Sequence, residues 1–139
     1  MKSTIFRIAA ASCALALSLF ASSDLAQAQQ PQIKRIAAKS GETVDLFTVF
    51  AQANCRSTLL ETPQVEVLQG PPELTLSVRE QIVAVPQFEC HNKLKGGMVV
   101  ATVGQVKQPI EGKLIFRVKF KTKVGESQNG HTFFYSLFP

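Results

Sequence analysis

The sequence predicts an all-β domain, namely an antiparallel, immunoglobulin-like sandwich of about seven strands preceded by a cleavable signal helix. Short runs of alternating apolar and polar residues recur along the chain, and proline and glycine clusters separate them. Two cysteines lie far enough apart to join separate strands. After residue 28, no segment has a long 3.6-residue periodicity. A small closed barrel is the alternative architecture.

The N-terminal segment has the three-part pattern of a secretory signal peptide. Lys2 and Arg7 supply positive charge, residues 8–20 are almost wholly apolar, and Ala26 and Ala28 form a small-x-small cleavage site. The apolar run is shorter than the roughly 18 residues that span a bilayer. We therefore expect cleavage after Ala28 and no transmembrane segment in what remains.

This signal predicts a periplasmic or secreted protein and divides the chain into three parts. Residues 1–28 are the signal peptide, residues 29–40 a leader with a first short strand, and residues 41–139 the β-sandwich domain. Cleavage removes two of the 15 basic residues and one of the 10 acidic residues, which leaves a net charge of about +4. That charge is compatible with acidic partners and equally with a weakly basic, solvated surface.

The same cleavage turns three cysteines into a pair. Cys13 lies inside the apolar run and is removed with it, so Cys55 and Cys90 remain in an oxidising compartment. A disulfide between them closes a loop of about 35 residues and contributes roughly 3–4 kcal/mol to stability. A redox-active pair or two free thiols are the alternatives, but the C-x-x-C spacing of redox proteins is missing.

The apolar runs predict the strands in order. Residues 43–50 begin with alternation and end more fully apolar, and residues 113–123 alternate most strictly. The other expected strands are 62–68, 73–78, 82–85, 98–106 and 131–138. Residues 51–61 are expected to form at most one helical turn.

The last two strands are expected to form a hairpin, but two turn signals compete to set its register. The turn lies either at 124–125 (Val-Gly) or at 129–130 (Asn-Gly). With the earlier turn, the odd-numbered residues from His131 to Tyr135 join the face of Phe116. A slip of one residue would move them to the opposite face.

Several motifs, taken in chain order, resemble those of a known group of proteins. They are the run 41–55, the Gly70-Pro71-Pro72 turn, Cys90 followed by Gly96-Gly97, the run 112–118 and the closing strand at 131–133. In this order they resemble small uncharacterised bacterial exported proteins with an immunoglobulin- or cadherin-like β-sandwich. The resemblance covers most of residues 29–139 and implies the same architecture. It implies no catalytic or ligand-binding residue.

The sequence argues against catalysis and against nucleic acid as a partner. It has no G-x-S-x-G elbow, H-E-x-x-H pair, S-x-x-K motif or phosphate-cradling glycine loop, and it has two histidines. It also has no basic-aromatic ribonucleoprotein motif and no zinc finger. We therefore expect a protein that is not an enzyme and uses no cofactor.

The sequence also raises the hypothesis of a copper site. Cys90, His91, Met98 and His131 supply the ligand types of a blue-copper centre. Their order and spacing differ from that family, and Cys90 is better used in a disulfide. We therefore expect no metal.

Four basic residues at alternate positions form the sharpest candidate binding feature. Arg117, Lys119, Lys121 and Lys123, here called the basic stripe, project from one sheet face about 6–7 Å apart, with no acid between them in sequence. Their repulsion must be relieved by solvent, by a cross-strand acid such as Glu126, or by an anionic partner. The stripe is either a solvated face or a docking surface for an anionic glycan, a lipid headgroup or an acidic envelope protein.

Together these features predict a non-catalytic exported binding module, stabilised by a Cys55–Cys90 disulfide. The alternative is a periplasmic inhibitor that presents glycine- and proline-rich loops to an enzyme. Its candidate loops are Gly70-Pro71-Pro72 and Lys95-Gly96-Gly97.

Overall fold

The computed structural model of the protein describes residues 34–85, 90–91 and 93–139. The predicted signal peptide, Cys13 and the cleavage site after Ala28 lie outside these residues. In the described part the chain is all-β, with sheets of four, three and two strands that stay open rather than closing into a barrel. Within the same residues, no helix is long and apolar enough to cross a membrane.

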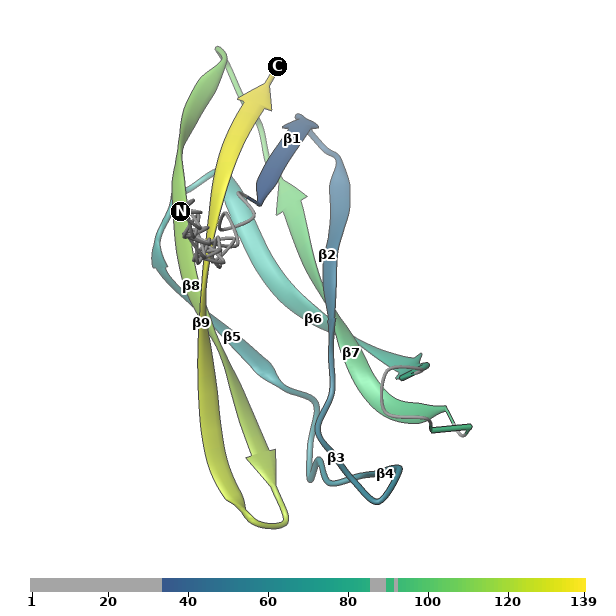
Figure 1. The fold of residues 1–139 in the computed structure, drawn as a ribbon. Coiled ribbons are helices and arrows are strands. Elements are labelled where there is room, and N and C mark those ends of the chain that lie inside the picture. The colour runs from purple at the N-terminus through teal and green to yellow at the C-terminus, as the bar shows by residue number, and fades with distance from the viewer. Residues whose placement is uncertain (1–33, 86–89, 92) are drawn as a thin grey trace, which may run out of the picture. The chain divides into compact units, whose positions relative to one another are not determined.

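The four-stranded sheet has the spatial order β1-β9-β8-β5. Its strands are β1 (Arg35–Lys39), β5 (Gln64–Gln69), β8 (Ile110–Thr122) and β9 (Gly125–Phe138). β8 and β9 form one long hairpin, in which Thr122 pairs with Gly125 and Phe116 pairs with His131 (Figure 1). The earlier of the two predicted turns is therefore the one used, and the expected placement of His131 on the face of Phe116 is confirmed.

The three-stranded sheet has the order β2-β7-β6. Its strands are β2 (Thr43–Val49), β6 (Leu74–Val83) and β7 (Leu94–Val103). The apolar run expected as a separate strand at 82–85 instead completes β6, because β7 pairs with β6 continuously from Val103 to Leu94. Two strands expected to be short are thus one strand of ten residues.

A two-stranded ribbon lies in the segment 51–61, where the sequence allowed at most one helical turn. Its strands are β3 (Gln52–Ala53) and β4 (Arg56–Ser57). The two residues between them, Asn54 and Cys55, have φ values of +51° and +59°. Two successive residues with positive φ are what a two-residue hairpin turn of type I′ requires, so the backbone closes a hairpin rather than a helix.

The first strand departs from the predicted antiparallel arrangement. β1 pairs with β9 in parallel, from Arg35 opposite Phe134 to Lys39 opposite Phe138. A turn at Gly41, whose φ is +81°, then carries the chain to β2 in the other sheet. The N–H of Ser40 donates to the carbonyl of Phe138 (2.9 Å), which fixes the end of β1 to β9 before the chain crosses.

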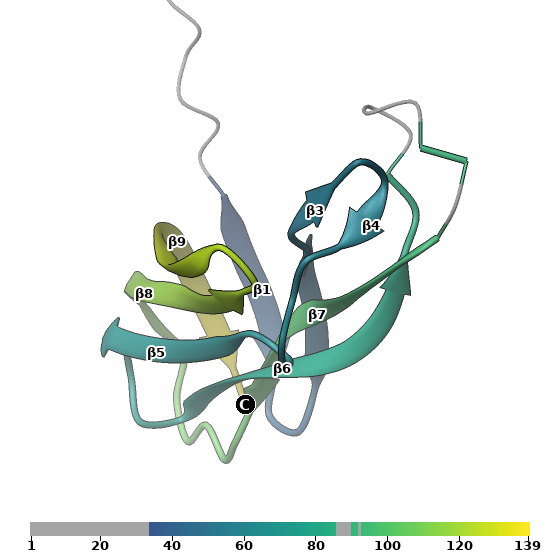
Figure 2. The ribbon, with the colours of Figure 1, turned by 90° about the horizontal axis from the view of Figure 1, so that it is seen from below.

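The four- and three-stranded sheets form two layers around one apolar core (Figures 1 and 2). The largest fully buried side chains come from both layers. They are Phe116, Ile36, Leu114, Leu137, Val85, Val99, Val103 and Val118. Since Leu114, Phe116 and Val118 alternate along β8, the residues between them face away from the core. We call that surface the outer face of the four-stranded sheet.

Gly96 lies in β7 beside the end of β2, where Val49 pairs with Gly97. A Cβ atom added at Gly96 would overlap the carbonyl oxygen of Val49 and would come within 2.9 Å of the Val83 side chain. Both neighbours are buried, and Val49 presents backbone, so neither moves aside cheaply. A glycine is therefore required for this packing.

We predict that Gly96→Ala lowers the free energy of unfolding by about 1–3 kcal/mol, because the added methyl group overpacks the contact with β2. Urea denaturation measures the change. Gly130→Ala in β9 is the matched control, since an added Cβ there meets nothing within 4 Å. Equal stabilities for the two variants would contradict the close approach.

Candidate functional site

The outer face of the four-stranded sheet contains the predicted basic stripe, and the structure gives three of its four cations acidic partners. Arg117 Nε donates to Glu66 Oε2 at 2.6 Å, and Lys119 Nζ lies 2.7 Å from the same oxygen. Lys121 Nζ lies 3.1 Å from Glu61 Oε1. The acids of these close pairs come from β5 and the segment before it, whereas Glu126, the cross-strand acid that the sequence suggested, lies opposite Lys121 on β9 and adds a weaker coulombic contribution.

The pKa values reflect this pairing. The hydrogen bonds from Arg117 and then Lys119 lower the pKa of Glu66 from an ordinary value of 4.5 to about 2. The hydrogen bond to Glu66 raises the pKa of Arg117. The pKa of Lys121 is raised mainly by its hydrogen bond with Glu61, and Glu126, which it faces across the hairpin, contributes further.

The stripe is thus a ladder of alternating charges rather than an unpaired row of cations. It lines a hollow of about 430 Å³, whose walls include Glu61, Lys119 and Gln128. Lys123 lies in the turn after β8, where its backbone N–H donates to the carbonyl of Thr58. An anion that approached this hollow would compete with carboxylates already in place.

A second group on the outer face combines one aromatic ring with two cations. Arg35 of β1, Phe134 of β9 and Lys113 of β8 occupy matching register positions across three adjacent strands, and we call them the cation–Phe row. The guanidinium carbon of Arg35 lies 5.9 Å from the Phe134 ring centroid, and Lys113 Nζ lies 5.7 Å from it. The sequence did not reveal this row, although Lys113 lies an even number of residues from Arg117 and so faces the same side of the sheet.

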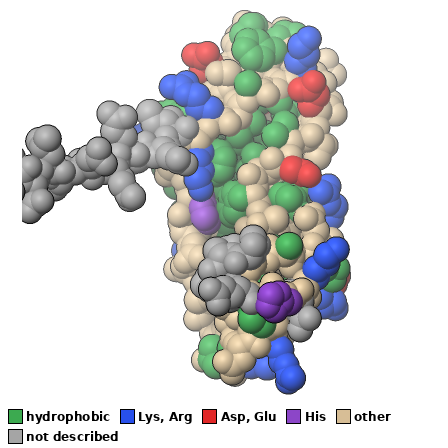
Figure 3. Space-filling model, turned by 45° about the vertical axis from the view of Figure 1, so that its right-hand side comes forward, with side chains coloured by type: hydrophobic (Ala, Val, Ile, Leu, Met, Phe, Trp, Pro, Cys, Tyr) green, Lys and Arg blue, Asp and Glu red, His purple; other side chains and the backbone are tan. Residues whose placement is uncertain are grey.

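Charge elsewhere on the surface is dispersed. On the face shown in Figure 3, lysine and arginine side chains lie along both margins and hydrophobic side chains gather between them. On the three-stranded sheet side, Arg79 pairs with Asp45 at 3.0 Å and Lys95 with Glu80 at 3.3 Å. Exposed pairs of this kind contribute little to stability, so they act chiefly by neutralising local charge.

His131 belongs to an aromatic cluster at the margin of the core. Its ring centroid lies 4.6 Å from that of Phe47 and 5.3 Å from that of Phe116. Lys34 Nζ lies 5.3 Å from the Phe47 ring centroid. Partial burial and then the positive charge of Lys34 lower the pKa of His131, so the neutral imidazole is favoured in the folded protein.

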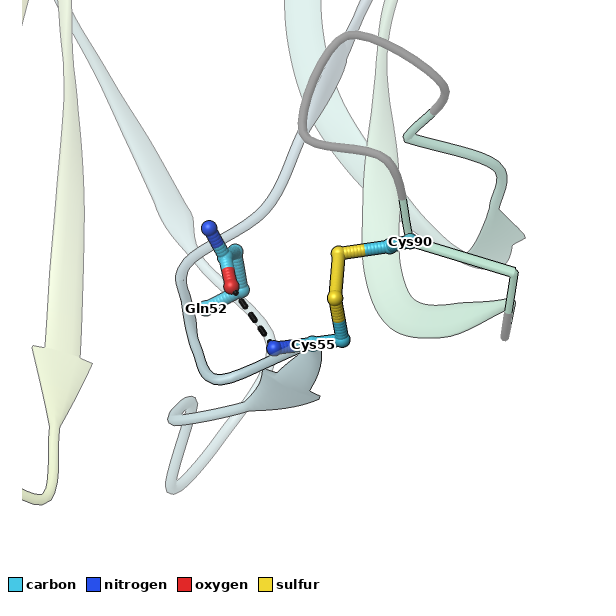
Figure 4. The surroundings of a disulfide bond; sticks show 3 residues. All are labelled: Gln52, Cys55 and Cys90. Atoms are coloured by element: carbon cyan, nitrogen blue, oxygen red, sulfur yellow. Dashed lines mark hydrogen bonds between the residues drawn. A yellow bond between two sulfur atoms is a disulfide. The ribbon is translucent and has the colours of Figure 1, made fainter.

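The predicted disulfide between Cys55 and Cys90 is confirmed (Figure 4). It links the β3–β4 turn to the chain that precedes β7, and the two Cα atoms lie 5.3 Å apart. The side chain of Gln52 accepts the backbone N–H of Cys55 at 3.1 Å, and Ser57 Oγ donates to the carbonyl of Lys95 at 3.0 Å. The ribbon is therefore attached to the three-stranded sheet by covalent and hydrogen bonds.

The residues weighed as copper ligands have other surroundings. Cys90 is in the disulfide, His131 packs against phenylalanine rings, and Met98 lies in the middle of β7. The described residues contain no group of three or more His, Cys, Asp or Glu side chains that could hold a metal ion.

One of the two loops assigned to an inhibitor is not a loop. Lys95, Gly96 and Gly97 lie within β7, and both glycines are buried. They are paired with β6, with Lys95 opposite Ile82. The Gly70-Pro71-Pro72 segment does connect β5 to β6 as a partly exposed turn. The structure therefore leaves the inhibitor hypothesis with one of its two contact loops.

Comparison with known proteins identifies no family, because no protein-family model and no curated protein matches the chain. The fold and the side-chain geometry are accordingly the basis for any functional conclusion.

We predict that the Glu66 carboxylate titrates near pH 2 and that Arg117→Met moves its pKa upward toward 4.5. Because the pKa is lower in the folded state, Glu66 stabilises the fold above its unfolded pKa, and this contribution is lost as pH falls through about 2. NMR titration of the side-chain carboxyl group measures both values. Arg79→Met on the other sheet is the control, and a wild-type midpoint near 4.5 would refute the pairing.

We also predict that the Cys55→Ala/Cys90→Ala double variant loses about 3–4 kcal/mol of unfolding free energy, because the denatured chain is no longer cross-linked. A Cys55→Gly/Cys90→Ala variant should recover about 1 kcal/mol of that loss, since glycine accepts the positive φ of position 55 without strain. Denaturant unfolding of both variants and the wild type gives the comparison. Equal stability of the two double variants would contradict a left-handed Cys55.

Proposed function

We propose that this protein is a non-catalytic, extracytoplasmic binding module with an immunoglobulin-like sandwich. The strand order supports the fold assignment. β2-β7-β6 and β9-β8-β5 correspond to the B-E-D and G-F-C strands of constant-type immunoglobulin domains, with β1 placed beside β9. The disulfide lies at one end of the domain and does not join β2 to β8, so the likeness concerns topology alone.

The export of the protein is supported by two independent features. Residues 1–28 have the pattern of a cleavable signal peptide, which predicts a periplasmic or secreted protein. A disulfide such as Cys55–Cys90 persists in oxidising compartments and is rare in the cytosol.

The observation that carries the binding function is the composition of the outer face of the four-stranded sheet. Phe134 and Phe138 are 38% and 40% exposed there, beside Arg35 and Lys113, which have no ion-pair partner within the described chain. Partly exposed aromatic rings beside cations without an acidic partner are suited to recognition, because one ligand can cover the rings and neutralise the charge. An anionic glycan, a lipid headgroup or an acidic envelope protein has the matching charge.

We predict that a photo-crosslinker at Thr132, on this outer face, captures a partner in intact cells, whereas one at Thr75, on the three-stranded sheet, does not. Both positions are exposed strand residues, so they form a matched pair. Crosslinking should weaken as ionic strength rises from about 0.1 M to 1 M, where the screening length falls from about 10 Å to 3 Å. Equal capture at both positions, no capture, or a cytoplasmic location of the protein would overturn the proposal.

A further inference from the structure

The cation–Phe row has a geometry that the ion-paired stripe lacks. Arg35 and Lys113 approach one ring from the two neighbouring strands, at 5.9 and 5.7 Å from the Phe134 centroid. Both distances are within the range of a cation–π contact, so the ring restrains both cations. The row therefore presents two positive groups that are already positioned on one small area of the sheet.

The charge of these two cations is not neutralised by an ion pair within the described chain. Two cations held near one ring repel each other, and a single anionic group between them would relieve that repulsion. Such a group would gain charge-assisted hydrogen bonds from both the guanidinium and the ammonium. A ligand of the row must therefore carry one anionic group.

The neighbouring pair of residues on the same face supplies hydrogen-bond acceptors and a hydroxyl group. Ser136 lies opposite Glu111, and its Oγ donates to Glu111 Oε1 at 3.2 Å. Together with Phe134 and Lys113 these residues border a hollow of about 380 Å³. A carboxylate at this place repels a second anionic group, but it accepts hydrogen bonds from neutral hydroxyl groups.

The neighbouring aromatic ring extends the apolar part of the surface. Phe138 lies opposite Lys39, four residues along β9 from Phe134, which is about 13 Å along an extended strand. The outer face thus offers cations, exposed rings and a hydroxyl-binding carboxylate in neighbouring rows.

Two other classes of partner fit this surface less well. An extended peptide that added as a strand would run along the free side of β1, or of β8 before Ile115; Phe134 lies one strand away from either side, on the internal strand β9, so such a peptide would not use its ring. A membrane would require protruding apolar side chains, whereas Phe134 and Phe138 lie on a sheet face; the 91% exposed Val124 lies at the β8–β9 turn, away from the row.

We infer that the cation–Phe row and Glu111 bind an acidic sugar of a uronic-acid polysaccharide. Arg35 and Lys113 hold the sugar carboxylate, Phe134 packs against the apolar face of the pyranose ring, and Glu111 with Ser136 accepts and donates hydrogen bonds to its hydroxyl groups. This inference rests on the proposed binding function and names its ligand class.

Titration calorimetry with polygalacturonate as the probe tests the inference. The intact exported protein should bind polygalacturonate, and Arg35→Gln or Lys113→Gln should each weaken binding about tenfold. Phe134→Leu, which keeps an apolar side chain but removes the ring, should also weaken it. Arg79→Gln and Lys95→Gln are the matched controls, because they make the same charge changes on the three-stranded sheet.

Three companion probes separate the alternatives: dextran as a neutral glycan, poly-L-glutamate, and vesicles of phosphatidylglycerol. Weak binding of all three beside strong binding of polygalacturonate supports an acidic sugar site. Equal losses in the control variants would overturn the row as the site. If the protein bound poly-L-glutamate or the vesicles through the row but did not bind polygalacturonate, the assignment of an acidic sugar as the ligand would be overturned. A failed titration with retained Thr132 crosslinks refutes the ligand class alone, whereas loss of both also refutes the binding module.

Discussion

The register of the β8–β9 hairpin is the constraint on which the rest of the structure depends. Side chains alternate along a strand, so the pairing of Thr122 with Gly125 decides the face of every residue up to Ile110 and Leu137. In this register Phe133 is 5% exposed and packs with Phe116, while its neighbour Phe134 faces outward. A one-residue slip of β9 would exchange them, so the core and the outer face are set by one choice of turn.

The position of β1 follows from that register. β1 adds to the free side of β9 in parallel, which places Arg35 beside Phe134, while Lys113 reaches the same ring from β8 on the other side. The row therefore consists of residues from three distant parts of the sequence. It exists because two strand pairings, one antiparallel and one parallel, coincide at Phe134.

The sequence was most informative where the structural cause is local. Alternation predicted β8 and β9, and the expected loss of Cys13 with a signal peptide predicted the Cys55–Cys90 pair. The β3–β4 hairpin was missed because its turn contains Asn54 and Cys55, and a cysteine with φ of +59° lacks the glycine that usually marks such a turn. The parallel β1–β9 pair and the acids that neutralise the basic stripe depend on pairings between distant strands, which alternation within one strand does not reveal.

The extent of β5 explains why the unpaired charge lies away from the basic stripe. β5 pairs with β8 from Ile115 to Lys119, and so brings Glu66 beside Arg117 and Lys119. Before Ile115 no β5 residue pairs with β8, so Lys113 has no acid from that strand opposite it. Three of the four alternate cations are therefore paired with acids in the fold, whereas Lys113, four residues before Arg117, has no ion-pair partner in the described chain. The free charge of a sheet face is decided by the strand beside it rather than by the strand that carries the cations.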